Sequence, residues 1–248
     1  MRILYNNLWD DYDLTESHED ANYPVENTQD IRLAKRWRTE TASAASIVID
    51  AGTGATITCD TCAVIEHNFN ASAGVFIQAN ATDSWAGASL SAQVSYRAGP
   101  MVLFFTSSAY RFWRFSFDHL TNADGYYEIG RLMLGAYLQI DPSSLVEFPE
   151  KHPRSDRLSF SISNQPYSDE GSEHKELSYQ FQYAGNTMKA SMVTLWETVG
   201  KHTPLLLMNY DTTYTVIEPL YCSIVDDMEF SHLKHDKWNF NLELRECD

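Results

Sequence analysis

The chain has 248 residues and a formal charge of −16, from 34 acidic side chains against 18 of Lys and Arg. Its 44% hydrophobic content is sufficient for packed cores, and its length suits two ordinary domains. The charge excludes ordinary nucleic-acid binding, which depends on Lys and Arg neutralising phosphates. No apolar run is long enough to span a membrane, so no membrane insertion is expected.

The start of the chain and its cysteines indicate a reducing compartment. Residues 1–6 become polar too early for the apolar segment of a secretory signal. The cysteines, Cys59, Cys62, Cys222 and Cys247, are too few and too scattered for a disulfide framework. We therefore expect free thiols in a protein that is made and kept in a cytoplasm.

The first fifty residues carry an ordered series of short motifs. Asn-Asn-Leu-Trp at 6–9 is followed by Tyr-Pro-Val-Glu-Asn at 23–27, by Arg-Trp at 36–37 and by Ile-Val-Ile-Asp-Ala-Gly at 47–52. This order resembles the opening of discoidin-like, or galactose-binding-like, jelly rolls. The resemblance implies a β-sandwich that binds surfaces or neighbouring proteins and rarely performs chemistry.

From residue 47 to 140, short apolar runs alternate with Gly, Asn, Asp and Ser, and no helical period persists. This pattern predicts an antiparallel sandwich in which Trp113, Phe115 and Phe117 share one face of a strand. Arg-Phe-Trp-Arg-Phe at 111–115 and Glu-Ile-Gly-Arg-Leu at 128–132 also resemble the closing strands of a discoidin-like jelly roll. The predicted strands are 47–50, 62–66, 74–78, 90–96, 101–105, 110–117 and 127–134.

A Pro-rich, charged connector at 141–153 predicts a domain boundary, with the first domain at 1–147 and the second at 148–248. Beyond it, clean alternation predicts two half-buried strands. The polar loop between them, 164–176, is too long for a tight hairpin and is expected either to contact a partner or to be disordered. The alternating apolar residues are Leu158, Phe160 and Ile162, then Leu177, Tyr179, Phe181 and Tyr183, and the loop carries Asp169, Glu170 and Glu173.

One helix is predicted at 187–199, where Met188, Met192, Leu195, Trp196 and Val199 fall on one face. Asn186 is expected to cap its start, and Gly200 with Pro204 to end it. Strands are predicted at 205–208, 214–217, 221–225 and 237–245. In the last strand Trp238, Phe240, Leu242 and Leu244 are expected to face in, and Asn239, Asn241, Glu243 and Arg245 to face out.

The order of strands around one helix is similar to the ring-forming β domain of phage distal tail and upper baseplate proteins. The expected fold is therefore all-β, a discoidin-like jelly-roll sandwich followed by a ring-forming β domain with one helix. The resemblance implies a structural protein of a phage tail tip, located in the virion tail and assembled in the bacterial cytoplasm. The implied partners are further copies in a sixfold ring, the tail tube protein, and baseplate hub or tail fibre proteins. Outward faces at 159–163 or 239–243 are expected at subunit or lumen surfaces.

Two other functions remain open. A carbohydrate-binding module or adhesin would bind a cell-surface glycan and expose aromatic side chains at the loop tips of the jelly roll. Trp9, Trp37, Trp85 and Trp113 include candidates for such a platform, although buried packing is the commoner fate of Trp in a sandwich. A glycoside hydrolase, or an accessory domain of one, would need two inward-facing carboxylates in a cleft.

Several clusters invite a chemical interpretation and are weighed against an ordinary structural one. Cys59 and Cys62 form a Cys-x-x-Cys, but a structural zinc needs a second close pair of ligands. Glu66-His67 and Asp118-His119 lack any accompanying catalytic motif. An acidic stretch near the start of the chain either binds calcium or forms a solvated loop, and it lacks the spacing of an EF-hand. It comprises Asp10, Asp11, Asp13, Glu16, Glu19 and Asp20.

The only dense basic cluster surrounds Trp37 and consists of Arg32, Lys35, Arg36 and Arg38. It is expected either to grip an acidic partner or, as the discoidin-like resemblance implies, to hold its own loop by stacking and ion pairing. No catalytic residue, cofactor or metal ligand is assigned, and the ligand-binding residues are left open. We expect a protein that is not an enzyme.

Overall fold

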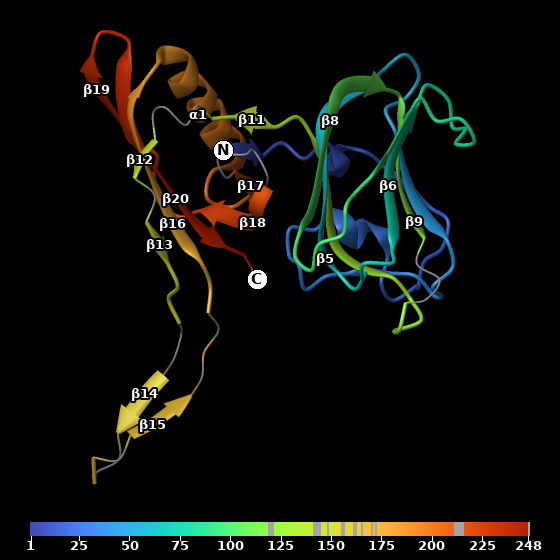
Figure 1. Ribbon diagram of the computed structural model, residues 1–248, viewed down its shortest axis with the longest axis horizontal. Helices are drawn as coiled ribbons and strands as arrows, with labels where there is room; N and C mark the ends of the chain where they lie inside the picture. The colour runs from blue at the N-terminus through green and yellow to red at the C-terminus, as the bar shows by residue number, and fades with distance from the viewer. Residues whose placement is uncertain are drawn as a thin grey trace. The chain divides into compact units, whose positions relative to one another are not determined.

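The computed structural model of the chain describes residues 1–118, 122–140, 145–147, 149–154, 157–160, 163–164, 166–169, 171, 173–210 and 216–247 (Figure 1). The fold is all-β with one helix, as predicted. Its contacts form two compact units, residues 1–139 with 205–221 and residues 140–204 with 222–248. The predicted boundary at 147 and 148 stays a prediction. The contacts differ from it in grouping 205–221 with the first unit, where β17 (Leu205–Tyr210) pairs with β1 (Arg2–Leu4).

Two antiparallel sheets make the sandwich of the first unit, which we call the jelly-roll unit. These two antiparallel sheets agree with the sandwich that the sequence predicts. The five-stranded sheet has the order β2 (Leu14–Glu16), β4 (Ala45–Asp50), β9 (Phe112–Asp118), β6 (Gly74–Asn80) and β7 (Leu90–Gln93). The four-stranded sheet has the order β3 (Trp37–Arg38), β10 (Glu128–Gly135), β5 (Ile57–His67) and β8 (Met101–Tyr110).

Strand β5 begins five residues before the predicted strand 62–66. Its register with β8 shifts between Cys59 and Thr61, which marks a β-bulge or irregularity. The first part of the strand alternates, with Ile57 and Cys59 buried and Thr58 exposed between them, whereas residues 62–65 are all buried. The prediction found only this continuous apolar run.

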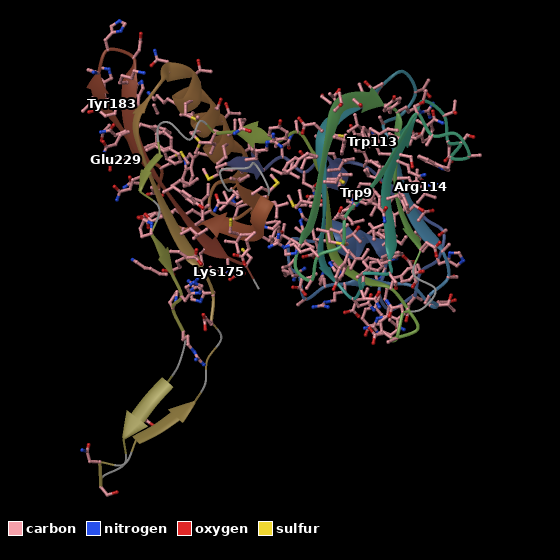
Figure 2. The ribbon with its side chains drawn as sticks, in the orientation of Figure 1. Trp9, Trp113, Arg114, Lys175, Tyr183 and Glu229 are labelled. Atoms are coloured by element: carbon pink, nitrogen blue, oxygen red, sulfur yellow. The ribbon has the colours of Figure 1, made fainter. Side chains whose placement is uncertain are left out.

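Aromatic side chains of β9 form the centre of the jelly-roll core. Trp113, Phe115 and Phe117 are fully buried on one face, as predicted. The ring of Phe115 packs edge-on against that of Trp9 with centroids 5.0 Å apart, and the ring centroids of Phe117 and Trp37 are 5.7 Å apart. Burying each Phe side chain contributes about 1.5–3 kcal/mol. Figure 2 shows Trp9 and Trp113 between the two sheets, and Arg114 on the outer side of the five-stranded sheet.

Two short helices complete the jelly-roll unit, η1 (Leu8–Asp11) and η2 (Val25–Gln29). Trp9 of η1 donates from Nε1 to the hydroxyl of Thr28 in η2, at 3.3 Å. Strand β1 pairs on one side with β17 and on the other with β11 (Leu138–Gln139). This strand has only three residues, too few to show an alternating pattern.

Two long antiparallel strands, β16 (Glu176–Ala184) and β20 (Lys237–Glu246), form the centre of the second unit, which we call the β domain. On the far side of β16 lie β12 (Leu145–Glu147) and β13 (Glu150–Lys151). On the far side of β20 lie residues 222–224 of β18 (Val216–Ile224), and β19 (Phe230–Lys234). Phe240, Leu242 and Leu244 are buried as predicted, whereas Trp238 is only half-buried.

The prediction that Tyr183 faces the core is wrong. Leu177, Tyr179 and Phe181 are buried as expected, but Tyr183 is 52% exposed and the next residue, Ala184, is fully buried. The register of β16 against β20 shifts between Phe181 and Ala184, and Tyr183 has φ +60°. One extra residue in the strand reverses the faces that follow it.

The predicted helix is confirmed as α1 (Asn186–Val199), with Met192, Leu195 and Val199 buried. The capping role expected of Asn186 is wrong, because the N-cap is Gly185 and no side chain caps the helix. Asn186 instead bonds with Asp236 and Trp238. Gly200, at φ +53°, ends the helix as predicted.

The interpretation of 164–176 as one long loop is wrong. Residues Pro166–Asp169 form β15, which pairs with β14 (Arg157–Phe160) in a separate two-stranded sheet. Ile162, Glu170 and part of the predicted strand 214–217 lie outside the described residues. Strand β19 was not predicted, because its residues from Ser231 to Lys234 are all exposed and show no alternation.

Candidate functional site

The Cys-x-x-Cys pair lies inside the jelly-roll core. Cys59 and Cys62 are fully buried on β5, and burial raises the pKa of both thiols. A raised pKa keeps a thiol protonated and poorly reactive. Within the described ranges, no three His, Cys, Asp or Glu side chains gather in a way that suits a metal ion.

The basic cluster is occupied by contacts within its own unit. The guanidinium of Arg38 lies between the rings of Tyr23 and Tyr126, at 4.1 and 4.2 Å. The ion pairs are Arg32 and Lys35 with Asp30, Arg36 with Glu66 and Glu128, and Arg38 with Glu128. These contacts support the loop-holding interpretation over a surface that grips an acidic partner.

The acidic stretch does not act as one cluster. Asp10 bonds with the buried Arg131 at 2.6 Å, while Glu19 accepts from the backbone N–H of Val25 at 2.6 Å. Asp11 and Asp13 instead line a surface groove. The stretch therefore divides between structural contacts and an open surface.

His67 is satisfied as a neutral ring. Its Nδ1 accepts from the backbone N–H of Phe69 at 3.2 Å, and its Nε2 lies 3.3 Å from the carbonyl oxygen of Gly99. Burial lowers its pKa. The adjacent Glu66 pairs with Arg36 rather than with the imidazole, and His119 lies outside the described residues. Glu66 and His67 thus have separate partners and do not form an acid–base pair.

A groove of the jelly-roll unit crosses the outer face of the five-stranded sheet and has a volume of about 510 Å³. Two ladder pairs supply its floor, Thr15 opposite Val48 and Asp50 opposite Phe112. One wall comes from residues 11–13, at the end of η1 and directly after it, and the other comes from Asp83 in the β6–β7 loop. The lining residues are Asp11, Tyr12, Asp13, Thr15, Val48, Asp50, Asp83 and Phe112.

Trp85 is fixed beside this groove by its own loop. The indole Nε1 donates to Asp83 at 2.8 Å, and the guanidinium of Arg114 lies 4.4 Å from the ring. The side chain of Asn80 ties the loop together, donating to the carbonyl of Ser84 at 2.7 Å and accepting from Ser89 at 3.0 Å. These bonds hold the half-buried indole in place before any ligand arrives.

Hydrogen-bond acceptors predominate among the polar groups of the groove. Arg111 holds Asp50 with two bonds of 2.6 and 2.7 Å and thereby lowers the pKa of that carboxyl. The remaining lining carboxylates belong to Asp11, Asp13 and Asp83. A carboxylate only accepts hydrogen bonds, so the groove favours a ligand rich in O–H or N–H donors.

Sequence reasoning found this site only in part. Trp9, Trp37 and Trp113 are fully buried, so of the four predicted candidates only Trp85 is accessible, and it donates to Asp83 in the lining of the groove. Asp50, Asp83 and Phe112 were not singled out, because they come from separate strands and a loop that only the fold brings together. Among aromatic side chains at loop tips, Tyr96 is 40% exposed and packs edge-on against His67 at 6.2 Å.

No family model and no curated protein matches the chain. Among solved structures, it is similar to a chitosan-binding module of a chitosanase/glucanase from Paenibacillus sp. IK-5, with 16% identity, 52% of this chain and 98% of that one covered, and a TM-score of 0.40. It is also similar to the family 32 carbohydrate-binding module of NanJ from C. perfringens in complex with galactose, with 12% identity, 56% and 100% covered, and a TM-score of 0.42. No helix in the described part of the chain is long and apolar enough to cross a membrane.

Proposed function

We propose that the chain is a non-catalytic binding protein whose jelly-roll unit holds a saccharide in the groove beside Trp85. The observation that supports this is the pairing of aromatic rings with carboxylates in one groove of about 510 Å³. The C–H faces of a sugar ring pack against Tyr12 and Phe112, while its hydroxyl groups donate to the aspartates. A volume of about 510 Å³ lies within the range of small-ligand sites.

Binding of saccharides to the full chain tests this proposal. A glycan array identifies the best-bound oligosaccharide, and titration calorimetry then measures its Kd. Tyr12→Ala is expected to weaken binding roughly ten-fold or more, because it removes one of the aromatic rings that line the groove. Tyr96→Ala is the matched control, since it removes another accessible aromatic ring from the same unit.

Two results would overturn the proposal, namely an array without signal or equal losses in the two variants. The same samples test the alternative of a glycoside hydrolase, which needs an acid and a base carboxyl across the bond that is cleaved. New reducing ends released from bound oligosaccharides would show turnover. We expect none.

The tail-tip function stays a prediction. It includes the sixfold ring, the tail tube, baseplate hub and tail fibre partners, and location in the virion tail. Electron micrographs of the full chain mixed with tube and hub proteins test it directly. Rings at a tube end would support it, and their absence from such mixtures would count against it.

A further inference from the structure

Strand β19 leaves one edge of the β domain open. It pairs with β20 along one side, and no other strand in the described ranges pairs with it. Leu233 on this strand is 46% exposed, and the nearby Tyr183 is 52% exposed. Figure 2 shows Tyr183 and Glu229 beside this strand. An open edge of this kind offers backbone N–H and C=O groups to another chain.

The hairpin of β19 and β20 is held in place by side chains on its inner face. Phe230 packs against Phe240 with ring centroids 5.3 Å apart, and His232 packs against Trp238 at 4.6 Å. Trp238 donates from its indole to Asn186 at 2.7 Å, which ties the hairpin to the start of α1. An edge fixed in this way loses little conformational entropy when it docks.

Charge is divided along the strand. At its Phe230 end, the residues that line a groove of about 240 Å³ include the acidic side chains Asp226, Asp227, Glu229 and Glu243. At its other end, Lys234 lies opposite Lys237 of β20 across the hairpin, so both flanks of the turn are basic. Asp227 is paired with Lys201 at 2.9 Å, and Asp236 lies in the turn between the two lysines. Glu229 and Lys234 are therefore the opposite charges that stand at the two ends of the edge.

We propose that β19 pairs with β19 of a second copy, antiparallel and about a twofold axis. Antiparallel pairing places the Glu229 end of each strand beside the Lys234 end of the other, so the opposite charges meet twice. Parallel pairing would place like charges together. The contact also covers Leu233, which is unusually exposed for its type. This assembly is independent of the saccharide proposal, and it would present two jelly-roll units to a surface.

Sedimentation of the full chain at low salt tests the pairing. The wild type is expected to dimerise reversibly and to dissociate as salt is added, because the contact depends on exposed charges. Glu229→Lys and Lys234→Glu should each weaken the homodimer roughly ten-fold or more, since each variant brings like charges together at both ends. An equimolar mixture of the two variants should form a heterodimer again, because every contact in it joins opposite charges.

Glu197→Lys is the matched control, because it makes the same charge change at an exposed position near the other end of α1. It should dimerise as the wild type does, and circular dichroism should show that all three variants fold. A wild type that stays monomeric at low salt would overturn the proposal. So would an assembly of more than two copies, or a mixture of the two variants that stays monomeric.

Discussion

The jelly-roll unit and the β domain use charge differently. In the jelly-roll unit, cations are joined to carboxylates from other strands and loops, as Arg36 is to Glu66 and Glu128, and Arg131 is to Asp10. In the β domain, Glu229 and Lys234 stand at opposite ends of one exposed strand. Pairing within a unit fixes its loops, whereas separation along an edge leaves charge available to another molecule. Substitutions should therefore change stability in the first unit and association in the second.

The largest effect is expected at the buried guanidinium of the jelly-roll unit. Arg131 is 1% exposed and donates to Asp10 and to the carbonyl of Gln29, both at 2.6 Å. Asp10→Asn should lower the free energy of unfolding by about 3–5 kcal/mol, because it leaves a buried charge without its counter-ion. Urea denaturation measures this loss. Asp13→Asn, at an exposed position, should change stability by about 0.5 kcal/mol or less, and equal losses in the two variants would refute the interpretation.

A smaller loss is expected where a guanidinium is stacked rather than buried. Arg38→Ala removes contacts with the rings of Tyr23 and Tyr126 and one of the partners of Glu128. This substitution should lower the free energy of unfolding by about 1–3 kcal/mol, because the cation–π contacts are lost and Glu128 keeps fewer hydrogen-bond donors. Arg32→Ala is the control in thermal and urea unfolding, because the Arg32 side chain is exposed and its pair with Asp30 should contribute little to stability. A larger loss of stability for Arg32→Ala than for Arg38→Ala would contradict the distinction between an exposed ion pair and a stacked guanidinium.

His67 should add a modest pH dependence to the jelly-roll unit. Burial lowers its pKa in the folded state, so the unfolded chain takes up the proton first as the pH falls. The free energy of unfolding should therefore decrease as the pH drops below about 6.5, the ordinary value for histidine. His67→Asn should reduce the change of the free energy of unfolding between pH 7.5 and 5.5. The same substitution at the exposed His18 should leave that change as it is in the wild type. A slope unaffected by His67→Asn would refute the assignment.

The jelly-roll strands were predictable where residues alternate without interruption. The burial of Trp113, Phe115 and Phe117 follows directly from the two-residue period of β9. The two-residue period predicted the wrong face for Tyr183, because the register shift reverses the faces there. It also gave no sign of β19, because none of the residues of that strand is fully buried. Bulges and edge strands depend on partners that lie elsewhere in the chain, so local pattern carries no sign of them.

The candidate groove was less predictable than the strands. Its residues come from the end of η1 and the segment after it, from strands β2, β4 and β9, and from the β6–β7 loop. The sequence identified Trp85 only as one tryptophan of four. What distinguishes it is burial, because the tertiary packing that encloses Trp9 and Trp113 leaves the indole of Trp85 beside a surface groove. Burial of this kind follows from the sheet pairing as a whole.

The smallest effect on stability is expected in the β domain, and it completes the contrast between the two units. Glu229→Lys changes an exposed side chain at the end of an edge strand, so the free energy of unfolding should shift by about 0.5 kcal/mol or less. Urea denaturation at a concentration where the chain is monomeric measures this shift without a contribution from association. Because an exposed charge is well solvated in the isolated unit, its energetic role should appear only when another molecule approaches. A loss of more than about 1.5 kcal/mol in this variant would show that Glu229 supports the fold itself, and charge separation along β19 would then no longer distinguish the two units.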